Sequence, residues 1–479
     1  MNFARDVVDR APADGRAIVE LARDGSRREW TFGEVADASA RLASRLTRVH
    51  GVQQGDLALI VIGNRPEWVL AMVACFRIGA VALPCNEQLR AKDLRYRFDT
   101  AKPKLILADD RNASEIEAAA PDCPVEYIPF TYGDDPAPAV ELQPIDPCLI
   151  TFTSGTTGEP KGIVHGQRYL PGQRLQSEHW LDARPGDLVW CTAASGWSKS
   201  ARNVFIAPWI RGAAALLHDA RFDPQERLRV VNDERVNVLC MAPTEYRVIA
   251  KRTTIAPLPY TRSLVAAGEA LNPEVLSVFK QATGLEIRDG YGQTETGQLT
   301  AMPFGQPARP GSMGRPLPGV DLTVEDGELV LREPTTDPTF FVRYLEAGEP
   351  APQDRPWRTG DRVQQDEDGF LYFEGRADDV IISAGYRIGP FEVESALVSH
   401  EAVAEAAVVA APDEERGAVV RAVVVLRDGY VPSDELAHNL QDHVKEQTAP
   451  YKYPRVVEFV GELPKTASGK VRRALLRDQ

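Results

Sequence analysis

The chain has 479 residues, of which 43% are hydrophobic, so it can bury a large core divided among more than one domain. Its formal net charge of -14 excludes a general binder of nucleic acid or of anionic membranes, because Lys and Arg would have to dominate the surface of such a protein. We therefore expect neither nucleic acid nor a membrane among its partners.

The cysteines, the histidines and the amino terminus carry no special signal. The six cysteines show no CxxC spacing and the seven histidines do not cluster, so we expect reduced thiols and no protein-built zinc site. Residues 1–16 carry charges throughout and lack an apolar core of signal-peptide length, so we expect a cytoplasmic protein. The most hydrophobic stretch, residues 68–83, is interrupted by Arg77 and too short for a bilayer span; it predicts a buried helix followed by a strand.

Strand-like and helical patterns alternate along the first half of the chain. From residue 56 to 109, the β-branched runs LALIVI, AVALP and KLILAD are separated by the helical patterns PEWVLAMVACFRIG and AKDLRYRF, which predicts βαβ units on a parallel sheet. The Pro-rich stretch 129–147 predicts a connection between subdomains that runs over the surface. After it, CLITFT, VNVLCMAP, SLVAAGE and LEIRDGY predict a second α/β unit.

The rest of the chain changes in composition twice. Around residues 310–334, Gly, Pro and the short runs DLTVED and ELVLRE predict a small β-rich element. The last hundred residues predict a separate α+β domain. The fold class is therefore α/β: a large domain (1–377) of two parallel subdomains (about 1–145 and 146–305) with the β-rich element (306–377), then a mobile C-terminal α+β domain (378–479).

The densest chemical signal follows the strand CLITFT directly. Glycines let a backbone approach an anion closely, hydroxyls and amides donate to phosphate oxygens, and a lysine adds positive charge. The order of residues is not that of a P-loop NTPase, which counts against a kinase or a GTPase. The sequence therefore predicts an ATP-phosphate loop formed by Thr153, Ser154, Gly155, Thr156, Thr157, Gly158 and Lys161.

The segment TSGTTGEPKG resembles the phosphate-loop signature of the adenylate-forming superfamily, which includes acyl-CoA synthetases, adenylation domains of peptide synthetases and firefly luciferase. Four further motifs follow in the family order, over nearly the whole chain. The next two lie beyond the carboxyl ends of predicted strands, where α/β sheets place their ligands. The resemblance implies that they flank adenine: Gly268, Glu269 and Ala270, then Asp289, Gly290, Tyr291, Gly292 and Gln293.

The resemblance also implies roles in catalysis and in nucleotide binding. Thr294 would bind the α-phosphate and Glu295 a Mg²⁺, a hard cation that prefers oxygen ligands. Asp361, in WRTGD, would accept hydrogen bonds from the ribose hydroxyls, and Arg376 would contact ribose or phosphate. Asp378 matches the hinge between the two domains.

Two C-terminal motifs complete the resemblance. The segment SAGYRI resembles the loop that closes on the site after domain rotation, and Arg387 belongs to this loop or contacts phosphate. The tail PKTASGK carries Lys470, which in the family reaches the reacting carboxylate and the α-phosphate. The residues that the resemblance assigns to coenzyme A are Ala384, Gly385, Tyr386, Arg416, Lys445, Tyr453 and Arg455; basic groups suit its nucleotide phosphates.

The identity of the acid is the least constrained part. Several stretches, among them IRDGYGQTETG and GYRIGPFEVESAL, look most like the medium-chain acyl-CoA synthetase branch. Acetate-activating relatives have a tryptophan in place of Gly292, so an open pocket for a larger acid is expected. Amino-acid-activating domains have an Asp where this chain has ASGWS, which favours a fatty or aromatic acid; Trp197 is either a pocket wall or core packing.

The sequence thus predicts an acid-thiol ligase that makes acyl-AMP and then acyl-CoA from ATP, coenzyme A and a medium-chain, branched or aromatic acid, with Mg²⁺ as cofactor. The nearest alternative is a ligase that loads a carrier-protein phosphopantetheine. From another class, a non-catalytic nucleotide-binding protein would be expected to lose Lys470, Glu295 or Asp361, and this chain keeps all three. The sequence is compatible with an oligomer.

Overall fold

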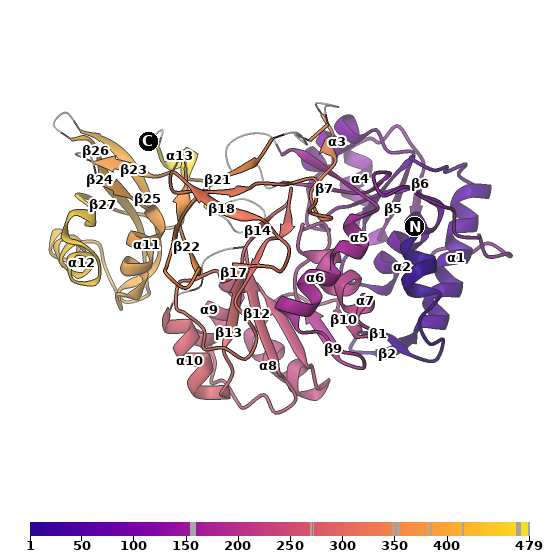
Figure 1. Cartoon of the computed structure of the whole chain (residues 1–479), viewed down its shortest axis with the longest axis horizontal. Coiled ribbons are helices and arrows are strands. Elements are labelled where there is room, and N and C mark those ends of the chain that lie inside the picture. The colour runs from indigo at the N-terminus through magenta and orange to yellow at the C-terminus, as the bar shows by residue number, and fades with distance from the viewer. Residues whose placement is uncertain are drawn as a thin grey trace.

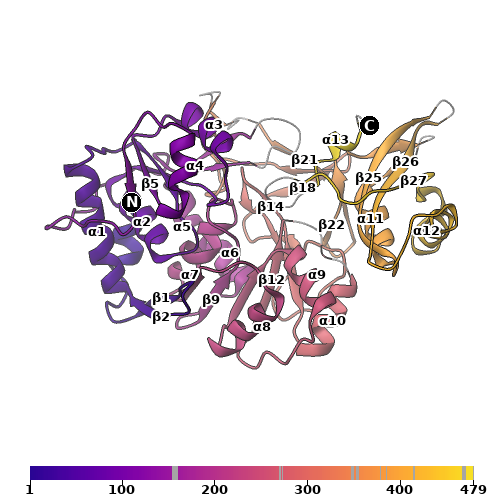
Figure 2. The same cartoon turned by 180° about the vertical axis from the view of Figure 1, so that it is seen from behind.

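The computed structural model describes residues 1–153, 160–268, 271, 273–346, 350–351, 355–377, 379–383, 386–413, 416–465 and 471–477. Figures 1 and 2 show a large body of two sheets with helices around them, and a smaller unit at the far end from helix α1 (Phe32–Arg48). A small sheet lies between them. No helix in the described part of the chain is long and apolar enough to cross a membrane.

The first large sheet has the strand order β20-β8-β7-β4-β3-β5-β6. Its parallel strands come from the βαβ units predicted from the sequence, with helices α2 (Pro66–Ile78) and α3 (Ala91–Ala101) as crossovers. Every residue of α2 except Glu67 is buried, which explains its apolar sequence. The strands are β3 (Leu57–Val61), β4 (Val81–Pro84), β5 (Leu105–Ala108), β6 (Val125–Tyr127), β7 (Pro147–Phe152), and the antiparallel β8 (Gly162–Gly166) and β20 (Arg343–Tyr344).

The second large sheet has the order β13-β12-β11-β9-β10-β1-β2 and is parallel except for its edge strand β2. Helices α8 (Pro224–Asp233), α9 (Pro243–Arg252) and α10 (Pro273–Thr283) connect its central strands. The strands are β1 (Arg16–Leu21), β2 (Arg27–Thr31), β9 (Leu188–Cys191), β10 (Ala214–His218), β11 (Val238–Met241), β12 (Ser263–Ala267) and β13 (Ile287–Gly290).

Sheet membership differs from the sequence prediction at two places. The run CLITFT forms β7, which pairs with β4 in the first sheet rather than opening the second unit. Strands β1 and β2, at the start of the chain, join the second sheet through β10. A boundary near residue 145 therefore does not separate the two sheets. The apolar pattern of a strand predicts its burial, whereas its partner is decided by contacts distant in sequence.

A layer of short helical segments packs between the sheets and carries much of the central core, together with α1 and α2. Ser177 in this layer donates to the Ala207 carbonyl at 2.8 Å, joining two of the segments. They are α5 (Tyr169–Gly172), α6 (Arg174–Gln176), the π-helical turns η3 (Ser177–Leu181) and η4 (Arg202–Ile206), and α7 (Ala207–Ile210).

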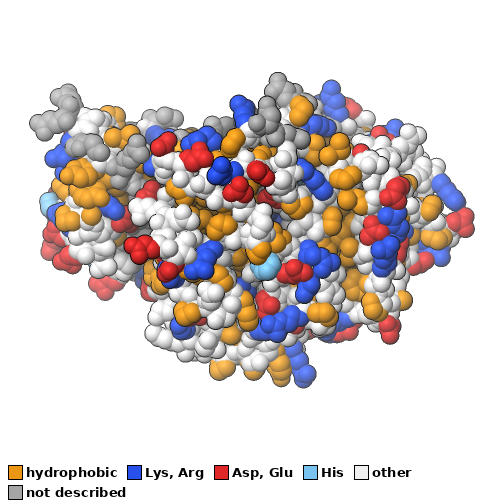
Figure 3. Space-filling model, in the orientation of Figure 1, with side chains coloured by type: hydrophobic (Ala, Val, Ile, Leu, Met, Phe, Trp, Pro, Cys, Tyr) orange, Lys and Arg blue, Asp and Glu red, His pale blue; other side chains and the backbone are white. Residues whose placement is uncertain are grey.

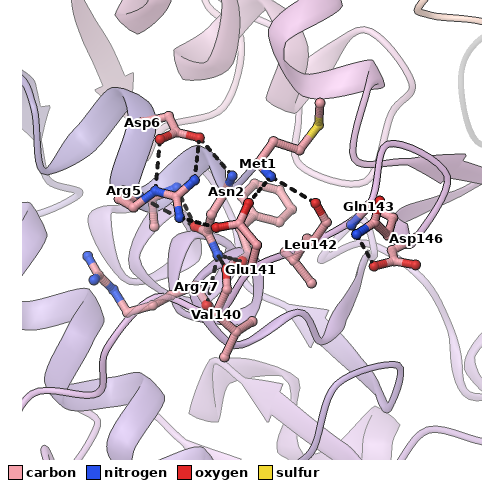
Figure 4. A network of polar contacts seen from close by, with 12 residues as sticks. Met1, Asn2, Arg5, Asp6, Arg77, Val140, Glu141, Leu142, Gln143 and Asp146 are labelled. Carbon is pink, nitrogen blue, oxygen red and sulfur yellow. Dashed lines mark hydrogen bonds and ion pairs between the residues drawn. The ribbon is translucent and has the colours of Figure 1, made fainter.

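The amino terminus is fixed to the first sheet by a polar network (Figure 4). The buried Asn2 amide donates to the carbonyls of Phe76, Arg77 and Val140 at 3.1, 2.9 and 3.0 Å. It thereby satisfies carbonyls at the end of α2 that have no partner within the helix. The same network holds the connection 129–147, predicted from its prolines, against the large body.

The small sheet consists of β18 (Leu322–Glu325), β19 (Glu328–Leu331), β21 (Trp357–Gln365) and β22 (Leu371–Arg376), all antiparallel. It corresponds to the predicted β-rich element. Two short hairpins lead into it, β14 (Gly292–Gln293) with β15 (Gly297–Gln298) and β16 (Thr300–Ala301) with β17 (Arg315–Pro316).

The C-terminal unit is α+β, as predicted, with its own core. A long hairpin of β25 (Val403–Asp413) and β26 (Gly417–Leu426) pairs with β27 (Val456–Phe459), and helices α11 (Pro390–Ser399) and α12 (Asp434–Gln447) pack on it. Strands β23 (Ile381–Ser383) and β24 (Tyr386–Ile388) and helix α13 (Arg473–Arg477) complete it. The remaining short elements are η1 (Ala4–Val8), η2 (Asp110–Asn112), α4 (Ala113–Ala118) and η5 (Pro450–Lys452).

Candidate active site

The predicted ATP residues gather where strands β12 and β13 end and the small sheet begins. Residues 267–268 and 289–290 lie next to each other because β12 and β13 pair in parallel, Ala267 opposite Gly290. The chain then turns into the hairpin β14–β15, which faces β21. The carboxyl edge of the second sheet and one end of the small sheet therefore border the same space.

Three predicted nucleotide residues form a hydrogen-bonded cluster around a fourth, Asp361, which is only 4% exposed. The Gln293 amide donates to its carboxylate at 2.8 Å, and Arg376 donates to the other oxygen at 3.2 Å. The Tyr291 hydroxyl donates to it as well. Gln293 is itself fixed, since its amide donates to the Thr359 carbonyl at 2.8 Å and its oxygen accepts from the Trp357 indole at 3.1 Å.

Burial dominates the electrostatics of this cluster. It raises the pKa of Asp361, while Arg376 and the hydrogen bonds from Tyr291 and Gln293 oppose that rise. Burial and the neighbouring carboxylate also raise the pKa of Tyr291, so its hydroxyl stays a donor. A buried carboxylate held by oriented donors is preorganised to accept from a pair of sugar hydroxyls.

A second cluster surrounds Glu295, the predicted Mg²⁺ ligand. Burial raises the pKa of its carboxyl group, and the Tyr344 hydroxyl beside it opposes that rise. The Lys161 ammonium lies 5.5 Å from the centre of the Tyr344 ring. One carboxylate completed by nucleotide phosphates is the donor set that Mg²⁺ commonly accepts, so the chemistry of this site fits the cation.

Two hydrogen bonds between Thr153 and Lys161 close the base of the phosphate loop. The Thr153 amide donates to the Lys161 carbonyl at 2.9 Å, and the Lys161 amide donates to the Thr153 hydroxyl at 3.1 Å. Between them, Ser154, Gly155, Thr156, Thr157 and Gly158 lie outside the described residues. The two ends of the loop thus continue the β7–β8 hairpin into the space beside Tyr344.

A third cluster contains a residue that sequence analysis missed. The Lys199 ammonium donates to the Ala267 carbonyl at 3.0 Å, and a Cβ at Gly268 would lie 3.3 Å from it. Gly268 has a φ of 102°, which favours glycine. Burial raises the pKa of Asp289 to about 8, and Lys199 opposes the rise. The sequence offered little signal, since Lys199 is one of two cations, with Arg202, in the stretch SKSAR after Trp197.

Gly292 has a structural reason to be glycine besides the expected pocket. Any Cβ there would overlap the Gly297 carbonyl across the hairpin β14–β15. A Cβ at Gly290 would meet the Trp180 indole nitrogen at 2.9 Å. Trp197 is half-buried. Gly196, which precedes it, has a φ of 86°, and a Cβ there would overlap the backbone of Cys85. The acyl-pocket role of Trp197 and Gly292 stays a prediction.

In the C-terminal unit, three of the predicted coenzyme A residues form one surface. The Tyr453 ring has the Lys445 ammonium 4.4 Å and the Arg455 guanidinium 4.7 Å from its centre. Beside it, the exposed Tyr386 ring stacks on Tyr451 at 4.4 Å, and Tyr451 was not predicted from the sequence. Two cations and stacked aromatic rings suit a nucleotide carrying phosphates.

The other predicted residues of this unit are not placed on that surface. Arg416 lies at the tip of the hairpin β25–β26, where its amide donates to Asp413 at 2.9 Å. Glu269, Ala270, Asp378, Ala384, Gly385 and Lys470, and the side chain of Arg387, lie outside the described residues. Their roles stay predictions.

Comparison with known proteins identifies the architecture. A family model described as AMP-binding enzyme matches residues 4–336, and one described as AMP-binding enzyme C-terminal domain matches residues 392–470. The chain belongs to the AMP-binding enzyme family. The two matches cover both the large body and the C-terminal unit.

Relatives of known sequence and structure agree with this assignment. The mitochondrial acyl-coenzyme A synthetase ACSM4 of Homo sapiens is 40% identical over 532 residues, covering 100% of this chain and 90% of the relative. The uncharacterized acyl-CoA ligase YtcI of Bacillus subtilis is 39% identical, covering 98% and 94%. The solved benzoate CoA ligase of Burkholderia xenovorans has a TM-score of 0.87 at 28% identity, covering 100% of both chains.

Three sequence predictions are therefore confirmed. The chain is a member of the adenylate-forming family, it has the predicted α/β fold class, and it is an AMP-forming acid-thiol ligase of the acyl-CoA synthetase type. The six cysteines are free thiols, as expected. The roles of individual residues and the domain boundaries stay predictions.

Proposed function

We propose that this AMP-binding enzyme converts a medium-chain, branched or aromatic carboxylic acid to acyl-AMP and then to acyl-CoA, with Mg²⁺ as cofactor. The observation that supports the proposal is the cluster of Tyr291, Gln293 and Arg376 around the buried Asp361, because a carboxylate held by donors at the carboxyl edge of a parallel sheet suits the hydroxyls of a ribose. It brings together motifs separated by some 70 residues of sequence.

In the first half-reaction, a carboxylate oxygen attacks the α-phosphorus of ATP and the bond from that phosphorus to the bridging oxygen breaks, releasing pyrophosphate. Both reactants are anions, so the site has to neutralise charge and hold an in-line geometry. We assign Lys161, Lys470 and Thr294 to the phosphates. Glu295 would hold the Mg²⁺, which supplies positive charge beside the leaving pyrophosphate.

In the second half-reaction, the thiol sulfur of coenzyme A attacks the acyl carbon, and the bond from that carbon to the phosphate oxygen breaks, releasing AMP. No nucleophile from the protein is needed. The surface of Lys445, Tyr453 and Arg455 would bind the nucleotide of coenzyme A, while the loop of Gly385 admits its thiol-bearing arm. Asp378 is the proposed hinge that exchanges Lys470 for this loop.

A pyrophosphate-release assay over short, medium, branched and aromatic acids, each with and without coenzyme A, tests the proposal. We expect ATP-dependent pyrophosphate release with at least one acid class, and acyl-CoA by mass spectrometry only when coenzyme A is present. An absence of pyrophosphate release with every acid would contradict it.

The acceptor separates this proposal from its nearest alternative. Both ligases share every ATP residue, so only the thiol distinguishes them. If free coenzyme A leaves the acyl-adenylate unconsumed whereas a phosphopantetheine-loaded carrier protein consumes it, the chain is a carrier-loading ligase.

A further inference from the structure

Arg202 is a buried arginine without a counter-charge. Only 5% of the residue is exposed, and its Nε and Nη1 atoms have no hydrogen-bond partner. In the described part of the chain, the three other buried arginines are paired or bonded: Arg77 with Asp9 at 2.5 Å, Arg227 with Glu245 at 2.8 Å, and Arg288 with the Ser263 hydroxyl at 2.6 Å. Among the described residues, no carboxylate lies within ion-pair distance of Arg202.

Two aromatic rings connect Arg202 with the proposed α-phosphate site. Its guanidinium interacts with the hydroxyl of Tyr169. The His165 ring stacks on Tyr169 with centroids 4.0 Å apart, and it lies near the backbone of Thr294. Burial lowers the pKa of His165 to about 3, and Arg202 adds to the effect, so the ring is neutral and adds no second positive charge beside Arg202.

The segment that carries Arg202 also carries the proposed pocket wall. Trp197 and Lys199 precede it by five and three residues, and both Lys199 and Arg202 act electrostatically on the thiol of Cys240 at the end of β11. Arg202 opens the π-helical turn η4, a widened geometry that occurs often at functional sites.

Two buried amide side chains lie in the same layer of short helical segments, Gln176 in α6 and Asn203, which follows Arg202 in η4. The Gln176 amide donates to the Asn203 oxygen at 2.7 Å, but the Gln176 oxygen and the Asn203 nitrogen have no partner, although both side chains are buried. A hydrocarbon tail would leave these groups and the guanidinium desolvated without compensation.

We propose that the acid activated by this enzyme carries a second hydrogen-bond acceptor, a carboxylate, carbonyl or hydroxyl oxygen, and that Arg202 binds it. The inference rests on the proposed function, since it concerns the acid of the same reaction. Arg202 is connected with Thr294 through the rings of Tyr169 and His165, so we place the acceptor on the body of the acid and not on its reacting carboxylate. Arg202 is a specificity-determining residue and takes no part in the chemistry.

Matched acids test the inference by pyrophosphate release. Hexanoate is compared with adipate and 6-hydroxyhexanoate, and benzoate with 3-hydroxybenzoate. We expect at least one acceptor-bearing acid to exceed its plain partner about tenfold or more in kcat/KM, because a site with buried donors rejects analogues that leave them unpaired. If both plain acids match or exceed all their partners, the inference is wrong.

Replacing Arg202 tests whether this residue causes the preference for acceptor-bearing acids. In Arg202→Met the preference should fall below about threefold, and Tm should stay equal or rise because an unpaired buried charge is removed. The control Arg174→Met alters an exposed arginine of α6 that pairs with Glu178 at 3.4 Å, and should keep the preference. An equal loss with all acids and a lower Tm in Arg202→Met would assign Arg202 a structural role and overturn the inference.

The two proposals fail in different ways. If the wild type releases no pyrophosphate with any acid, the proposed function fails and the inference with it. If the plain acids react as well as or better than their partners, only the inference fails.

Discussion

At the scale of single residues, Asp361 is the position on which we expect nucleotide binding to depend most. Its carboxylate has donors on both oxygens, from Gln293 and Arg376, and is buried. Asp361→Asn keeps the shape but replaces one acceptor oxygen by a donor that faces other donors. We expect KM for ATP to rise about tenfold or more, the loss of a charged hydrogen bond of about 1.5–3 kcal/mol.

The measurement is ATP-dependent pyrophosphate release at varied ATP. Asp368→Asn is the matched control, because Asp368 lies exposed between β21 and β22, close in sequence to Asp361. An Asp361→Asn enzyme with an unchanged KM for ATP would contradict the ribose role.

Asp289 makes folding stability depend on pH. Burial raises its pKa from 3.8 to about 8, so the folded protein binds this proton more tightly than the unfolded chain does. The stabilising contribution is therefore fully present below pH 3.8 and is lost as pH rises toward 8. We expect the Tm of Asp289→Asn, relative to that of the wild type, to rise between pH 5 and pH 8.5. Thermal unfolding of both proteins across that range is the measurement, and a constant difference would refute the assignment.

At the scale of elements, the loop between β9 and η4 is fixed by one close backbone approach. A Cβ at Gly196 would lie 2.6 Å from the carbonyl carbon of Cys85, and φ there is 86°. Gly186 has a similar φ of 84° with open space around it. Both alanine variants bear the left-handed backbone penalty of about 1–2 kcal/mol, but only Gly196→Ala also has the overlap, which adds about 1–3 kcal/mol.

Chemical denaturation of the two variants measures this difference. Since Trp197 follows Gly196 directly, we also expect Gly196→Ala to raise KM for the acid, while Gly186→Ala leaves it unchanged. Equal destabilisation by the two substitutions would mean that the loop moves freely away from Cys85.

Most elements could be predicted from the sequence, because their apolar patterns are local. Strand β3 and helix α2 follow directly from LALIVI and PEWVLAMVACFRIG. The sheet to which a strand belongs could not be predicted in the same way. Strand β7 joins the first sheet and β1 the second, because the partners of a buried strand are chosen by contacts distant in sequence.

The same division holds for the site. Asp361 and Tyr291 were found because each lies in a motif with its own spacing. Tyr344, Lys199 and Arg202 were missed because a single tyrosine or cation forms no sequence pattern. Their roles depend on residues that only folding brings close to them: the Glu295 carboxylate to Tyr344, Gly268 to Lys199, and Tyr169 to Arg202.

At the scale of the whole molecule, a large body and the C-terminal unit lie at opposite ends of the chain's structure. Figures 1 and 2 show β25–β27 and α12 at one end and the two large sheets at the other. Contact runs through α11 and β22: a Cβ at Gly389 would lie against the Glu374 carbonyl, and a Cβ at Gly375 would lie 3.2 Å from the Pro390 ring. On the face seen in Figure 3, charges of both signs are interspersed, which agrees with substrates that are small molecules.

We expect the C-terminal unit to present different surfaces in the two half-reactions, and Lys470 tests this division. In the family it acts on the carboxylate and the α-phosphate, so Lys470→Ala should lower the rate of acyl-AMP formation by about a hundredfold or more, the size of one lost charge-stabilising group. Thioester formation from supplied acyl-AMP should change less than about threefold, because for transfer to the thiol we expect the C-terminal unit to present its Gly385 loop instead of Lys470. Lys465→Ala is the control: its ammonium pairs with Glu405 at 2.6 Å on the surface of the same tail, and such pairs contribute about 1 kcal/mol or less. Single-turnover measurement of each half-reaction decides the matter, since a Lys470→Ala enzyme slowed equally in both would mean that the unit works from a single position.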